Sequence, residues 1–177
     1  MKKFINNISI RLPFGNIVRD RHVLLVIKDQ YGNYLLGEKP KFYPKGICRL
    51  VGGGIEKNET PEKAAIREAQ EELTIKISNE NLLPIAEVKT KAKTTEKTLI
   101  NTTYIYLLVG INQLKLQAND DITGLRRFSK KELSSLINEY NSFADNDFYS
   151  GDDDYKHYWN DYGKMYSFIH QTVLDLT

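Results

Sequence analysis

Apolar residues in the first third of the chain fall into short runs separated by turn residues. Residues 21–39, RHVLLVIKDQYGNYLLGEK, hold two such runs on either side of a turn at 30–33. The β-branched residues of the first run favour a strand, and Tyr-Gly-Asn favours a turn. We therefore predict a β-hairpin here, followed by a short strand over 47–51 that leads into the three consecutive glycines 52–54.

A helical pattern begins shortly after these glycines. Residues 61–73, PEKAAIREAQEEL, start with a proline, which is favoured at the first helical position, and Thr60 before it is a good N-cap. With 3.6 residues per turn, Ala65, Ala69 and Leu73 form one stripe along this helix. We expect the stripe to face the hydrophobic core.

The rest of the chain continues the mixture of strands and helices. Apolar segments at 82–93 and 97–111 indicate strands around a loop rich in Lys and Thr, and 130–140 has a helical pattern. An acidic and aromatic tail, residues 141–177, ends in a predicted helix over about 163–174. No internal repeat is visible.

Length and composition place the chain among soluble globular proteins. With 177 residues, 41% of them hydrophobic and 27% charged, we expect one domain over residues 1–177. No apolar run approaches the roughly 18 residues that cross a bilayer, and the N-terminus lacks the apolar core of a signal peptide. We therefore expect a cytoplasmic protein without a membrane partner.

Charge and cysteine content exclude further classes. The formal net charge of +2 is too small to indicate nucleic acid as the main partner. The lone Cys48 excludes an intramolecular disulfide and a cysteine-based zinc cluster, and we interpret it as a small buried side chain on a strand.

The predicted helix carries a cluster of glutamates. Glu68, Glu71 and Glu72 stand at i, i+3 and i+4, so their carboxylates share one helix face. Like charges at this spacing oppose helix formation by roughly 0.2–0.5 kcal/mol per pair, which a bound cation would reverse. Mg²⁺ prefers such oxygen ligands. Taken alone, however, such a sequence is also typical of a solvent-exposed helix.

A longer pattern distinguishes these alternatives. Gly53 is followed after five residues by Glu59, and seven further residues lead to REAQEELTI. Over residues 53–75 this pattern resembles the signature of the Nudix hydrolases. The resemblance implies an α+β fold, the Nudix-type α/β/α sandwich with a mixed β-sheet. It also implies hydrolysis of a nucleoside diphosphate linked to another moiety, with Mg²⁺ or Mn²⁺ as cofactor.

The resemblance assigns roles to individual residues. It implies Glu71 and Glu72 as catalytic residues, and it matches Glu59 and Arg67 to a pair that supports the loop and helix around the site. Arg67 lies one turn before Glu71, where it could neutralise and orient that carboxylate. The implied metal ligands are Glu68, Glu71, Glu72 and the main-chain carbonyl of Gly52.

Two positions depart from the family pattern. Asn58 and Thr74 stand where glycines are usual. Asparagine tolerates the left-handed backbone conformation, whereas a β-branched threonine resists it. Either the helix ends differently at Thr74, or strain is stored there. Neither change removes a carboxylate, so we expect the metal site to persist.

Several assignments stay open. The general base could be Glu71, Glu72 or a later loop carboxylate, and a nucleoside triphosphate and a nucleotide sugar are both candidate substrates. A homodimer is also left open. The alternative function is a Nudix-fold module that binds a nucleotide without cleaving it. The candidate loop carboxylates are Glu96, Asp120 and Asp121, and the candidate phosphate contacts are Lys39, Arg49, Lys89, Lys91 and Lys93.

The tail is predicted to influence the choice of substrate without supplying the chemistry. Its aromatic side chains offer flat surfaces on which a base could stack. The alternative is that they pack in the core. The residues concerned are Phe148, Tyr149, Tyr155, Tyr158 and Trp159.

Overall fold

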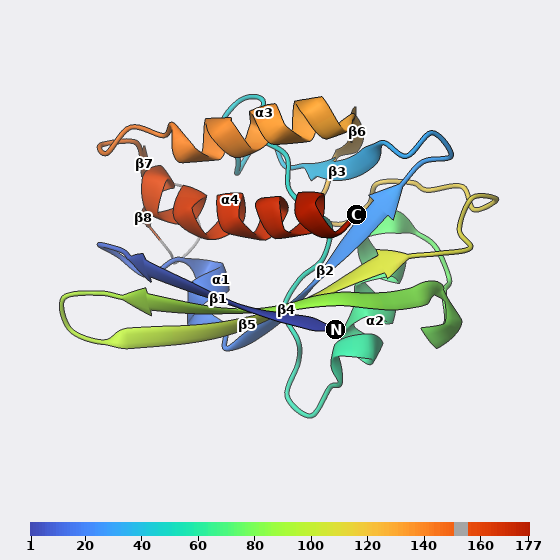
Figure 1. The fold of residues 1–177 in the computed structure, drawn as a ribbon, viewed down its shortest axis with the longest axis horizontal. Coiled ribbons are helices and arrows are strands. Elements are labelled where there is room, and N and C mark those ends of the chain that lie inside the picture. Colours follow the sequence, from blue (N-terminus) through green and yellow to red (C-terminus); the bar gives the residue numbers. More distant parts are fainter. Residues whose placement is uncertain (151–155) are drawn as a thin grey trace.

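A six-stranded mixed sheet forms the centre of the molecule (Figure 1). The computed structural model describes residues 1–150 and 156–177. The strand order is β1-β4-β5-β2-β3-β6, with β1 parallel to β4, β2 parallel to β5 and the other neighbours antiparallel. The strands are β1 (Lys2–Ser9), β2 (Arg21–Lys28), β3 (Tyr34–Glu38), β4 (Leu82–Lys93), β5 (Thr98–Leu108) and β6 (Gly124–Phe128).

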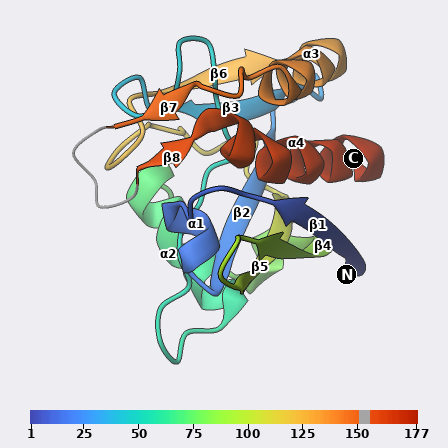
Figure 2. The same cartoon turned by 90° about the vertical axis from the view of Figure 1, so that its left-hand side faces the viewer.

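Helices lie on both sides of this sheet, as the predicted α+β sandwich requires. Figure 2 shows α3 and α4 on one side of β2 and α2 on the other. A small hairpin, β7 (Phe148–Tyr149) and β8 (His157–Tyr158), precedes the last helix. The helices are α1 (Gly15–Val18), α2 (Pro61–Leu73), a 3₁₀ turn at Asn79–Asn81, α3 (Lys130–Asn141) and α4 (Trp159–Leu176).

Strand β2 separates two hydrophobic cores. Val23 and Leu25 pack with the α2 side chains, whereas Leu24 and Val26 pack with those of α3 and α4. Successive strand residues point to opposite faces, so a strand buried on both faces must be apolar throughout. This explains the uninterrupted run VLLVI at 23–27.

The predicted hairpin and the helix over 61–73 are confirmed, and the strand predicted over 82–93 matches β4. The prediction of a strand over 47–51 is wrong, because this segment forms only isolated β-bridges. Arg49 bridges to Gly37 of β3, whereas Val51 bridges to Leu25 of β2. The segment therefore crosses from one strand to the next and does not run along either.

The structure has one strand that the sequence did not predict and one helix that is longer than predicted. The N-terminal residues form β1, an edge strand whose mainly exposed residues gave little apolar signal. Helix α4 begins at Trp159, four residues before the predicted start at 163. Gly163 lies inside this helix, where its lack of a side chain allows α3 to approach closely.

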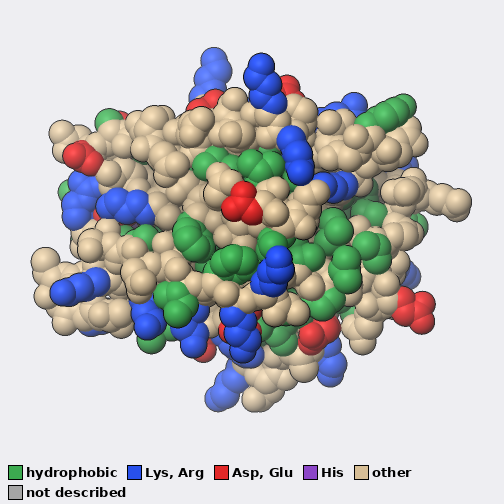
Figure 3. Space-filling model, in the orientation of Figure 1, with side chains coloured by type: hydrophobic (Ala, Val, Ile, Leu, Met, Phe, Trp, Pro, Cys, Tyr) green, Lys and Arg blue, Asp and Glu red, His purple; other side chains and the backbone are tan. Residues whose placement is uncertain are grey.

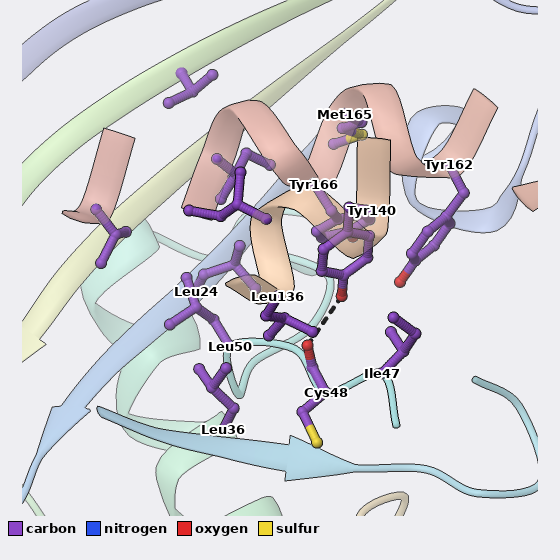
Figure 4. Packing of buried hydrophobic residues seen from close by; sticks show 14 of the residues in the cluster. Leu24, Leu36, Ile47, Cys48, Leu50, Leu136, Tyr140, Tyr162, Met165 and Tyr166 are labelled. Carbon is purple, nitrogen blue, oxygen red and sulfur yellow. Dashed lines mark hydrogen bonds between the residues drawn. The ribbon is translucent and has the colours of Figure 1, made fainter. Parts of the chain in front are cut away.

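The contact between α3 and α4 also fixes the segment that leads to the glycines. The Tyr140 hydroxyl of α3 donates a 2.9 Å hydrogen bond to the Cys48 carbonyl (Figure 4). Cys48 itself is buried. The two C-terminal helices thus hold one side of the loop that carries the family motif.

The face of the molecule that Figure 1 presents, with α3 and α4 above strands β1, β4 and β5, is mixed in character. Figure 3 shows small groups of apolar side chains between polar atoms, with Lys and Arg side chains distributed over the same face. Among the described residues, no helix has the length and apolar character that a membrane span needs.

We predict that Gly163→Ala lowers the free energy of unfolding by roughly 1–3 kcal/mol, the usual cost of overpacking. A Cβ at residue 163 would lie 2.1 Å from the Tyr140 carbonyl oxygen. Helix propensity alone would give the opposite sign, about 1 kcal/mol of stabilisation. Urea unfolding measures the change, with exposed Gln171→Ala on the same helix as the control. A stabilised Gly163→Ala variant would contradict the close packing of α3 on α4.

Candidate functional site

Helix α2 begins as the sequence predicts. The Thr60 hydroxyl accepts a hydrogen bond from the Lys63 main-chain N–H at 3.3 Å. The end of α2 is less usual, because Thr74 takes the left-handed conformation with φ 57°. Asn58 also has a positive φ, of 68°. Both departures from the family pattern therefore keep the backbone conformation that glycine would favour.

The glycines before α2 allow two close approaches. Gly52 has φ 131°, and a Cβ there would lie 2.3 Å from the Val23 carbonyl oxygen. A Cβ at Gly53 would lie 2.5 Å from Oε1 of Glu68. Only glycine fits at residue 52, because its φ is positive and the chain passes against the backbone of β2, whereas a Cβ at residue 53 would require the Glu68 side chain to move.

Arg67 connects this loop to the glutamate helix. Its Nε and Nη2 donate to the two carboxylate oxygens of Glu59 at 3.1 and 3.0 Å, and Nη2 also donates to the Gly54 carbonyl at 2.8 Å. Nη1 donates to Glu68 at 2.7 Å and to Glu71 at 2.9 Å. These hydrogen bonds hold the pKa of Glu59 below its usual range. The predicted contacts of Arg67 with Glu59 and Glu71 are present.

The carboxylates of α2 differ in exposure. Glu68 and Glu72 are buried, whereas the Glu71 side chain is 46% exposed. Burial raises the pKa of Glu68. Glu72 accepts a 2.7 Å hydrogen bond from the Gly52 N–H and lies 3.5 Å from Nζ of Lys39. The carboxylates of Glu68 and Glu72 are thus largely shielded from water, and the cations Arg67 and Lys39 stabilise their negative charges.

These residues fit a divalent cation by their chemistry. Three carboxylates and the Gly52 carbonyl supply the oxygen ligands that Mg²⁺ and Mn²⁺ take. Within residues 1–150 and 156–177, no three acidic, His or Cys side chains are arranged to hold a metal ion. Glu68 and Glu71 instead share Nη1 of Arg67. Cation binding would require at least one of them to turn from Arg67.

A cavity of about 960 Å³ lies against these carboxylates. Its wall includes both charged and aromatic side chains. Its charged residues include Lys39, Arg49, Glu68, Glu71, Glu72 and Asp121. Its aromatic residues are Phe14, Phe42, Tyr43, Tyr149, His157 and Tyr162.

A family model described as the NUDIX domain matches residues 18–149. The chain belongs to the Nudix family. Over 59 residues it is 41% identical to an 8-oxo-dGTP diphosphatase from Proteus vulgaris, a match that covers 33% of this chain and 53% of that protein. The chain thus spans about half the length of this curated relative.

Solved Nudix structures share the fold. A Nudix hydrolase from M. smegmatis, RenU, has a TM-score of 0.51 and 22% identity, covering 71% of this chain and 81% of that one. The E. coli dihydroneopterin triphosphate pyrophosphohydrolase has a TM-score of 0.50 and 20% identity, covering 68% and 85%. Helix α4 lies beyond the residues that the family model matches.

The predicted loop carboxylates of this Nudix protein separate into two groups. Asp120 and Asp121 line the cavity, whereas Glu96 lies in the turn between β4 and β5, outside its lining. Asp121 forms a 2.8 Å ion pair with Lys39, which lowers the pKa of the Asp121 carboxyl. The loop before Asp120 also caps α2, since the Asn119 N–H donates to the Glu72 carbonyl at 3.0 Å.

The predicted phosphate contacts separate in the same way. Lys39 and Arg49 line the cavity. Lys89, Lys91 and Lys93 are exposed on β4 and are absent from its lining. Their alternation along the strand places them on the solvent-facing side of the sheet.

The tail contributes a different set of aromatic residues from the predicted one. Tyr149 lines the cavity, as do His157 and Tyr162, which the sequence did not single out. Trp159 is buried behind them, at ring distances of 4.9 Å from His157 and 5.2 Å from Tyr162. The Arg11 guanidinium lies 3.5 Å from the centre of the Tyr158 ring.

The two remaining aromatic residues predicted in the tail are Phe148 and Tyr155. Phe148 is exposed and packs on Tyr158, and it is not among the residues that line the cavity. Tyr155 and the acidic run at 152–154 lie outside the described residues. The spacing of aromatic residues at 159, 162, 166 and 170 could have indicated one buried face of α4, and with it Tyr162.

We predict that Thr74→Gly raises the free energy of unfolding by about 1 kcal/mol, because a side chain in the left-handed region costs roughly 1–2 kcal/mol. Thr74→Ala is the matched control. It keeps the Cβ and loses the 3.3 Å hydrogen bond from the Thr74 hydroxyl to the Gln117 carbonyl. Urea unfolding compares the three proteins. Equal stability of the glycine and alanine variants would show that no strain is stored at this helix end.

Proposed function

We propose that this Nudix protein hydrolyses a diphosphate bond in a nucleotide. The observation that carries the proposal is the complete set Glu68, Glu71 and Glu72 at the wall of a cavity of about 960 Å³. A cavity of this size accommodates a small ligand. Its charged side chains suit a phosphate chain, and its aromatic side chains suit a base.

The site residues have different proposed roles. Glu68, Glu71 and Glu72, with the Gly52 carbonyl, would hold Mg²⁺ or Mn²⁺. Such a cation, when bound, neutralises phosphate oxygens and lowers the pKa of a water molecule. Arg67 fixes the loop against the helix through Glu59 and orients Glu71.

Glu71 is the best candidate for the general base. It is the most exposed carboxylate of the three and lines the cavity, so it can accept a proton from an attacking water. Glu72 is less suited, since its two oxygens already face the Gly52 N–H and Lys39. Asp121 is the second candidate, since it lines the same cavity and is ion-paired with Lys39 much as Glu71 is with Arg67.

A nucleoside triphosphate is the substrate class that we favour. The relative from Proteus vulgaris, 41% identical over 59 residues, is named an 8-oxo-dGTP diphosphatase. A nucleotide sugar is the other candidate, because the cavity is large enough for a second polar moiety.

A nucleotide sensor is the alternative function. The sharing of Arg67 by Glu68 and Glu71 favours it, because this arrangement satisfies two carboxylates without a cation. A panel of nucleoside triphosphates, dinucleoside polyphosphates, ADP-ribose and nucleotide sugars with Mg²⁺ or Mn²⁺ separates the two functions. Phosphorus NMR should show cleavage of a diphosphate bond. Tight binding without any turnover would instead establish the sensor.

We predict that Glu71→Gln and Glu72→Gln each lower kcat by at least about 10²-fold, the usual contribution of a positioned catalytic group. Both changes keep the side-chain shape and remove the charge. The matched control is Glu62→Gln on the same helix, which accepts a hydrogen bond from Tyr106 and lies outside the cavity lining. Full activity in both variants, with the fold verified by circular dichroism, would exclude this helix as the catalytic site.

A further inference from the structure

Arg49 is a buried cation in the wall of the cavity. The residue is 7% exposed and lines the cavity near the loop of glycines. Its backbone is fixed by two hydrogen bonds with Gly37 of β3, at 2.8 and 3.1 Å. A charged side chain is almost never buried to this extent without an ionic partner. The position of Arg49 therefore calls for an explanation.

The partners of its guanidinium are neutral. Nη1 donates to the hydroxyl oxygens of Tyr166 and Tyr162 at 3.0 and 3.4 Å, and Nη2 donates to the Gly52 carbonyl at 3.2 Å. The guanidinium carbon lies 5.1 Å from the centre of the Tyr166 ring. Nε is buried and has no hydrogen-bond partner among the described residues.

The carboxylates nearby form ion pairs with other cations. Glu72 pairs with Lys39, and Arg67 binds Glu59, Glu68 and Glu71. None of the ion pairs found among the described residues includes Arg49. Burying a charge without an ion-pair partner is costly even when neutral groups hydrogen-bond to it, and an anionic ligand would neutralise the charge of Arg49.

We propose that Arg49 binds a phosphate group of the ligand in this cavity, and that Tyr162 and Tyr166 of α4 position its guanidinium. The proposal rests on the proposed function only for the presence of phosphate in the ligand, and it requires no hydrolysis. Of the five N–H donors of a guanidinium, the three hydrogen bonds of Arg49 leave the Nε–H and one Nη2–H, which lie on the same edge and could bind phosphate oxygens.

The location of Arg49 determines which part of a ligand it meets. Its hydrogen bond to the Gly52 carbonyl places it beside the loop whose N–H binds Glu72. Lys39, a second cation of the lining, is within 3.5 Å of the same glutamate. Arg49 therefore faces the phosphate chain beside the glutamates.

The positioning of Arg49 comes from a part of the chain beyond the family match. Tyr162 and Tyr166 stand one turn apart on α4, and both of their hydroxyls accept a hydrogen bond from Arg49. Figure 4 shows Tyr162 extending toward the segment that carries Ile47 and Cys48. Their rings stack at 4.4 Å. Helix α4 thus acts on the ligand through Arg49, in addition to packing on the sheet.

The test is direct binding of inorganic pyrophosphate, measured by calorimetry once with Mg²⁺ and once with a chelator. Arg49→Gln should weaken binding at least tenfold in whichever condition the wild-type protein binds. Tyr166→Phe keeps the stacked ring and removes the hydroxyl that accepts hydrogen bonds from Arg49 and from Asn16, so it should weaken binding several-fold at a temperature where circular dichroism shows the variant folded. The matched control is Arg127→Gln, an exposed arginine on β6.

Each outcome decides the proposal. Unchanged pyrophosphate affinity in Arg49→Gln, or absence of wild-type binding in both conditions, overturns it. If Arg49→Gln does not fold, Tyr166→Phe decides in the same way: weakened binding supports the positioning role and unchanged binding overturns it. Binding that depends on Arg49, in a protein that cleaves no nucleotide of the panel, would support this proposal and contradict the proposed hydrolase.

Discussion

The hydrogen bonds of Arg67 are the interaction on which the site depends. One guanidinium joins Glu59 and the Gly54 carbonyl in the loop to Glu68 and Glu71 on the helix. Because its five donors form a rigid fork, the loop and the helix must keep a fixed relative orientation. The same contacts gather negative charge on one side of the cavity and offset part of its mutual repulsion.

The surrounding fold supports this arrangement from two sides. Strand β2 separates the core beneath α2 from the core beneath α3 and α4. It also holds the loop of glycines, because the Val23 N–H donates to the Gly53 carbonyl at 2.9 Å. The 3.0 Å hydrogen bond from Asn119 to the Glu72 carbonyl fixes the end of α2 and brings Asp121 toward Lys39. Helix α4 adds Tyr162 to the aromatic part of the wall.

The sequence predicts the local elements well and the long-range contacts poorly. The helix over 61–73 has both a cap and an apolar stripe, and the glutamate spacing follows from helical geometry, so these features could be read directly. The contacts of Arg49 with Tyr162 and Tyr166 span more than 110 residues and leave no periodic signal. Strand β1 was missed because an edge strand buries few of its side chains.

The central claim is that the α2 carboxylates Glu68, Glu71 and Glu72, two of which Arg67 binds, form a divalent cation site. Anomalous diffraction from crystals grown with Mn²⁺ tests it most directly. We expect an anomalous peak bounded by the carboxylates of Glu68 and Glu72, with the Glu68 carboxylate turned away from Nη1 of Arg67. The absence of a peak at these residues, with Arg67 still bound to both Glu68 and Glu71, would contradict the account.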